Sequence, residues 1–138
     1  MFFGTAEGLD YTWFVQGREA IAPSLQSLTT EQASKSIAPG VATIAAHANH
    51  ILYTLRGDNA YFGSPEPEGS WEDSWSVQQV NAAQWDELRA AILREYEQLQ
   101  TNLSGHEPTN EQEMLGLLSA VPHMAYHLGA IRQLMKLL

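Results

Sequence analysis

Apolar side chains in this chain recur every three or four residues, and no stretch shows the strict alternation that is typical of a half-buried strand. The clearest example lies between Val80 and Leu103, where the apolar stripe comprises Trp85, Leu88, Ile92, Tyr96, Leu99 and Leu103. Such stripes are typical of amphipathic helices that bury one face. We therefore predict four main helices near residues 8–28, 41–56, 81–104 and 110–138, with no sheet.

Residue types at the expected helix ends support these boundaries. Asn81 with Gln84, and Asn110 with Glu113, have the spacing of a capping box, in which each side chain bonds the backbone N–H of the other residue. Gly57 follows the second helix and is expected to be its C-terminal cap, because helices often end at a glycine.

Two prolines and one long segment interrupt the helical pattern. Pro23 and Pro122 fall inside expected helices and should kink or divide them. Residues 58–79 lack a helical period and are rich in glycine, proline and acidic side chains. Trp71 and Trp75 lie in this segment, and we expect both indoles to be mostly buried against the helices.

Four amphipathic helices with one long connection are typical of a four-helix bundle. Between the first two helices we expect a connector with a short helical turn at residues 30–33. The chain is long enough to bury one core, and neither an internal repeat nor a second domain is evident. The predicted fold is therefore all-α: a single four-helix-bundle domain over residues 1–138, with a long crossover connection between the second and third helices.

Composition narrows the function classes. The net charge of -9 argues against non-specific binding to nucleic acid or to an anionic membrane surface. The chain has no cysteine, so any metal must be held by His, Asp, Glu or water, and any thiol chemistry needs a thiol from outside. From the sequence we expect no apolar run long enough to span a bilayer, and the first residues do not resemble a signal peptide. We therefore expect a cytoplasmic protein.

The last expected helix carries a pair of histidines. His123 and His127 are four residues apart, which places both imidazoles on one helical face, and two imidazoles so placed can bind one metal ion. The same face continues through the apolar positions Ala120, Ile131, Leu134 and Leu138. The pair therefore points into the core, and the alternative interpretation is a pair of core histidines without a metal.

The second expected helix offers a third imidazole. His47 falls on its apolar stripe, whereas His50 lies about 60° away around the helix and is expected to flank it. His47 is thus the predicted partner of His123 and His127, with His50 as its possible replacement. Three imidazoles around one ion leave a position open for water or substrate, as in catalytic sites. His106 lies in a loop and is assigned to solvent.

Several metal and catalytic motifs are absent. No histidine has a glutamate three residues before it, which excludes the di-iron bundle pattern. Met124 follows the first histidine of the pair where zinc proteases of the zincin type need a glutamate. The chain also has neither a glycine-rich phosphate loop nor a Gly-x-Ser-x-Gly motif.

Two stretches resemble the DinB-like, or YfiT-like, superfamily, and the resemblance covers almost the whole chain. The more specific one is the final-helix pattern of two histidines followed by a glycine-containing turn, His123-x-x-x-His127-Leu128-Gly129-Ala130-Ile131-Arg132-Gln133. The other is the second-helix segment Ile44-Ala45-Ala46-His47. The resemblance implies a four-helix bundle, often a homodimer, in which three histidines hold a zinc or nickel ion. Carried over, the metal ligands are His47, His123 and His127. Many members have Gln where this chain has Ala130, so any role of that Gln is unsupported here.

The resemblance also implies a function class. Members of known activity include transferases and isomerases that use low-molecular-weight thiols. We therefore expect a metal-dependent enzyme acting on a small molecule, either a thiol-dependent S-transferase or a hydrolase. Tyr126 and His50 are the nearest candidates for a general base, and neither is preferred. The alternative is a non-catalytic metal-binding or stress-associated homodimeric bundle.

Overall fold

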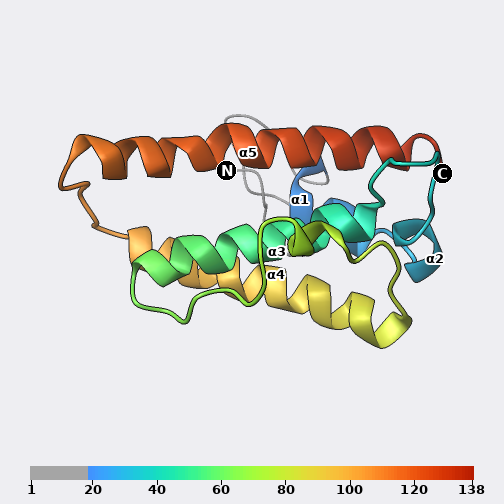
Figure 1. Ribbon diagram of the computed structural model, residues 1–138, viewed down its shortest axis with the longest axis horizontal. Coiled ribbons are helices and arrows are strands. Elements are labelled where there is room, and N and C mark those ends of the chain that lie inside the picture. Colours follow the sequence, from blue (N-terminus) through green and yellow to red (C-terminus); the bar gives the residue numbers. More distant parts are fainter. Residues whose placement is uncertain (1–18) are drawn as a thin grey trace.

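The computed structural model describes residues 19–138, which form helices joined by loops (Figure 1). In chain order the elements are α1 (Ile21–Gln26), α2 (Thr30–Ala33), α3 (Ile44–Tyr61), the 3-10 helix η2 (Asp73–Trp75), α4 (Ala82–Leu103) and α5 (Glu111–Met135). Residues 19–138 contain no strand, so the all-α prediction is confirmed for this range. Most of the predicted first helix lies outside the described residues, and the expected helical turn at residues 30–33 is confirmed as α2.

The core lies where α3 meets its neighbours. α3 packs most extensively against α4 and also contacts α5, while α1 contacts both α4 and α5 (Figure 1). The largest fully buried apolar side chains come from all four of these helices: Ile21, Leu25, Ile44, Ile51, Leu55, Trp85, Ile92 and Ile131. The indole Nε1 of Trp85 donates a hydrogen bond to the carbonyl oxygen of Leu28 at 3.1 Å. This bond satisfies the one polar atom that the buried ring carries.

The predicted caps are formed in different degrees. Asn81 and Gln84 make the full capping box at the start of α4. At the start of α5, Asn110 accepts a hydrogen bond from the backbone N–H of Glu113 at 2.9 Å. The Glu113 carboxylate bonds the backbone N–H and the hydroxyl of Thr109, at 2.6 and 2.7 Å. The second predicted box is therefore half formed, because Thr109 takes the carboxylate that the box requires.

Gly57 is not the C-terminal cap of its helix, so that prediction is wrong. α3 continues through Gly57 to Tyr61, and the first glycine after the helix, Gly63, has a positive φ. Asn59 explains the extra turn, because its buried side chain donates to the carbonyl oxygen of Glu95 on α4 at 2.9 Å. A contact between two helices thus outweighs the local preference for ending a helix at glycine.

The two prolines differ in their effects on the helices that hold them. Pro23 lies in the first turn of α1, where a helix needs no backbone N–H donor, so α1 simply begins just before it. Pro122 lies inside α5, which continues as one helix from Glu111 to Met135 without the predicted restart.

The connection between α3 and α4 lies against α3 through its 3-10 helix (Figure 1). Asn49 donates to the carbonyl oxygen of Ser74 at 2.8 Å, and the Thr43 hydroxyl donates to the carbonyl oxygen of Gln78 at 2.8 Å. Trp75 is half-buried, whereas Trp71 is 51% exposed. The prediction that both indoles are mostly buried is therefore wrong for Trp71.

One helix within the described residues, α5, is long and apolar enough by length and composition alone to cross a membrane. This differs from the sequence expectation that no apolar run reaches that length. Core helices of soluble proteins pass the same test, so the finding does not locate the protein.

Candidate metal centre

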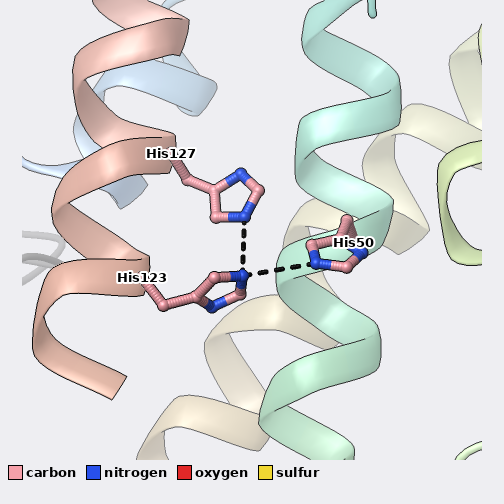
Figure 2. Close-up of side chains that lie close together, drawn as sticks. All are labelled: His50, His123 and His127. Carbon is pink, nitrogen blue, oxygen red and sulfur yellow. Dashed lines mark hydrogen bonds between the residues drawn. The ribbon is translucent and has the colours of Figure 1, made fainter. Parts of the chain in front are cut away.

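Three imidazoles from α3 and α5 converge on one point (Figure 2). Nε2 of His127 lies 3.0 Å from Nε2 of His123, and Nε2 of His123 lies 3.3 Å from Nε2 of His50. Two nitrogens that bind one zinc ion at about 2.0–2.1 Å with tetrahedral angles lie about 3.3 Å apart. The candidate ligand atoms of the three histidines all lie within 4.8 Å of one another, so His50, His123 and His127 lie close enough to hold one metal ion.

Helical spacing explains how α5 delivers its pair. His123 and His127 are one turn apart, and the uninterrupted helix through Pro122 keeps both rings on the side that faces α3 (Figure 2). His127 is fully buried, whereas His123 is partly exposed to solvent. The cluster is therefore closed on the His127 side and reaches the surface beside His123.

His50, which the sequence predicted to flank the apolar stripe of its helix, is completely buried. The ring of Trp75 stacks on the His50 ring with centroids 4.2 Å apart, and the ring of Trp71 meets it edge-on at 4.3 Å. The connection after α3 thus buries a side of the helix that lies outside the apolar stripe. The stripe alone could not predict this burial.

His47 is buried beside the cluster, and the structure brings it next to His127. Its Nδ1 lies 3.0 Å from Nδ1 of His127, on the opposite edge of that ring from the nitrogen that faces His123. The group of three that meets the distance requirement therefore contains His50 in the place predicted for His47.

Ser74 holds the outer nitrogen of His50, and sequence reasoning missed it. The Ser74 hydroxyl donates to the carbonyl oxygen of Trp71 at 2.6 Å and lies 2.5 Å from Nδ1 of His50. Because the hydroxyl has one proton and gives it to Trp71, it must accept the proton of His50 Nδ1. Nε2 of His50 is then left with the free lone pair that a metal needs. In the sequence, the one indication that Ser74 lies near the cluster was its position between Trp71 and Trp75.

Burial keeps the clustered imidazoles neutral. It lowers the pKa of His47 and of His50 to about 4, and in His50 the nearby charges of His123 and His47 act in the same direction. Burial followed by the charges of the other three histidines lowers the pKa of His127 to about 3, and burial also lowers the pKa of His123. Neutral imidazole is the form that binds metal, so the donor set suits a divalent ion.

The remaining candidates lie at or outside the edge of this cluster. His106 is not free in solvent as predicted, because its Nε2 lies 2.5 Å from a carboxylate oxygen of the buried Glu113. It takes no part in the group of three. The ring of Tyr126 lies 5.1 Å from that of His127, and its side chain is 61% exposed. Tyr126 therefore borders the cluster on its solvent side.

Comparison of the chain with known family models, with curated proteins and with solved structures finds no match in any of the three. The resemblance to the DinB-like superfamily therefore rests on the two stretches quoted from the sequence and stays a prediction.

Proposed function

We propose that the protein is a divalent-metal-dependent enzyme of the DinB-like type that acts on a small molecule, as a thiol-dependent S-transferase or a hydrolase. The observation that supports this most is the convergence of the three Nε2 atoms of His50, His123 and His127. Three protein ligands leave at least one coordination position for a further molecule, which distinguishes catalytic sites from closed structural ones. The proposal includes a four-helix-bundle domain and a cytoplasmic location.

A divalent ion held by three neutral imidazoles would supply a charge that lowers the pKa of a thiol or a water at the open position. The surrounding residues would orient and shield the reacting group. His50 and His127 are buried and fix the inner side, while the partly exposed His123 marks the side from which a small molecule can enter. Tyr126 and Trp71 are exposed next to this side and offer aromatic surface to a substrate.

The donor set favours particular metals. Imidazole nitrogen suits zinc, nickel, copper and iron, whereas magnesium and calcium prefer oxygen ligands. Zinc or nickel is therefore the proposed ion, and a low-molecular-weight thiol is the proposed co-substrate of the transferase. With no cysteine in the chain, that thiol has to come from outside.

Metal analysis of the purified protein tests the proposal. We expect close to one equivalent of zinc or nickel per chain in the wild type and in His106→Ala, whose histidine lies outside the cluster. His123→Ala should lose most of it, because a partly exposed ligand can be removed with little damage to the core. Wild-type protein that takes up neither metal at micromolar concentration would contradict the proposal. Thiol-conjugation and hydrolysis assays, with and without added metal, then separate the two reaction types.

One observation favours the second candidate, a non-catalytic homodimeric bundle. Met114, Leu115 and Leu118 on α5 are 47%, 58% and 56% exposed, which is typical of a face that meets a partner. Sedimentation analysis should then show a dimer that Leu115→Glu with Leu118→Glu converts to a monomer. A dimer without metal-dependent turnover of any tested thiol or ester would favour this candidate over the enzyme.

A further inference from the structure

We propose that His47 is a positioning residue that hydrogen-bonds the outer nitrogen of His127, and that it is not a metal ligand. This inference rests on the proposed metal site and assigns its fourth histidine a different task from the other three. It also reverses the sequence prediction that His47 is a ligand, and the reason lies in which ring nitrogens face each other.

Both nitrogens of His127 are engaged, on opposite edges of the ring. Nε2 lies 3.0 Å from Nε2 of His123, and Nδ1 lies 3.0 Å from Nδ1 of His47. A nitrogen that binds a metal gives its lone pair, so a neutral His127 that binds through Nε2 carries its proton on Nδ1. That proton points at Nδ1 of His47, which must accept it. The proton of His47 is therefore on its own Nε2.

The same arrangement is present at the other buried ligand. The outer nitrogen of His50 donates to the hydroxyl of Ser74, which in turn donates to the carbonyl oxygen of Trp71. Metal-binding histidines generally donate their second N–H to such a partner, which fixes both the tautomer and the orientation of the ring. With His47 in that role, each of the two fully buried ligands has a buried partner for its outer nitrogen.

The surroundings of His47 hold it in this role. The ring is 5% exposed, and the edge of Trp75 packs against it with centroids 5.2 Å apart. His47 and His50 are three residues apart and share a face of α3, so one helix supplies both a ligand and the support of a second ligand.

Two substitutions separate a positioning residue from a ligand. His47→Leu introduces an apolar side chain of similar size and removes the acceptor, whereas His47→Asn replaces the nitrogen acceptor by an amide oxygen. We measure zinc affinity by competition with a chromophoric chelator, and the number of bound imidazoles by X-ray absorption. We expect His47→Leu to bind zinc about 10- to 100-fold more weakly while three imidazoles remain bound. His47→Asn should recover most of the affinity, and His127→Ala should lose one imidazole.

The outcomes that overturn the inference differ from those that overturn the proposed function. A fall from three to two imidazoles in His47→Leu or His47→Asn would make His47 a ligand, and unchanged affinity in His47→Leu would remove its positioning role. Either result leaves the metal site in place. Wild-type protein without zinc overturns both proposals.

A measurement on the wild type covers the case in which His47→Leu does not fold. In the zinc-loaded protein, nitrogen-15 spectra of the imidazoles should show His47 as the Nε2–H tautomer with no metal-bound nitrogen. A metal-bound nitrogen in His47 contradicts the inference without any substitution.

Discussion

The tautomer of each buried histidine is fixed by an atom outside the ring. For His50 that atom is the hydroxyl oxygen of Ser74, which is itself committed to the carbonyl oxygen of Trp71. The ring can therefore present only Nε2 as a free lone pair. One serine in the 3-10 helix η2 thus decides which nitrogen of a histidine on α3 is free to bind a metal.

Ser74→Ala should weaken zinc binding about 10-fold or more, because it removes the acceptor for Nδ1 of His50. Ser76→Ala is the matched control, since the Ser76 hydroxyl is exposed and bonds only the carbonyl oxygen of Asp73 among the hydrogen bonds of the described residues. Chelator competition measures both variants. Equal affinities in the two variants would contradict the role of Ser74.

The neutral histidines also make metal-free stability depend on pH. The pKa of His47 and of His50 falls from 6.5 to about 4 on folding, and that of His127 to about 3. Between about pH 4 and pH 6.5 the unfolded chain binds protons on these rings that the folded chain does not, so the free energy of unfolding rises with pH. Burial raises the pKa of Asp58 from 3.8 to about 6, which opposes this slope with a single group.

Urea denaturation of metal-free protein should therefore show stability increasing from pH 4.5 to pH 6.5. His127→Gln should make the slope shallower, because it removes the group with the largest lowering of pKa. A wild-type stability that stays constant across this window would contradict neutral buried imidazoles.

At the scale of the helices, the capping residues contribute measurably to the free energy of unfolding. The Asn81 side chain accepts a hydrogen bond from the backbone N–H of Gln84 at 2.9 Å, and Gln84 returns a bond to the Asn81 N–H at 2.8 Å. We expect Asn81→Ala to lower the free energy of unfolding by about 1 kcal/mol. Gln79→Ala, an exposed neighbour outside the helix, should change it by less than about 0.5 kcal/mol. Denaturant titration of both variants is the test, and equal losses would contradict a capping effect.

The sequence predicted well which residues are helical, and it predicted poorly which segments pack against each helix. The stripe and capping box of α4 predicted its bounds to within one residue, because those signals are local. Gly57 failed as a stop signal, since the Asn59 amide bonds α4 and extends α3. His50 was misplaced for the same reason: the Trp75 ring that covers it comes from another segment. Periodicity describes one helix alone and carries no information on what packs against it.

At the scale of the molecule, metal binding should raise stability. An ion that binds only the folded chain stabilises it by about 2.7 kcal/mol at a free concentration one hundred times the dissociation constant. We expect zinc to raise the melting temperature of the wild type and of His106→Ala, and to leave that of His123→Ala unchanged. Calorimetric scans with zinc and with a chelator measure this. An equal rise in His123→Ala would place the ion elsewhere.

His50 and His123 are 73 residues apart in the chain and sit on α3 and α5. An ion between them would link the two ends of that segment, as a disulfide does in other proteins. By loop-closure entropy, a disulfide across a loop of this size stabilises the folded state by about 4 kcal/mol. This chain has no cysteine with which to make such a tie. A chelator would therefore remove this link between α3 and α5. The concentration of free metal in the surroundings would then set how much the link stabilises the position of α5.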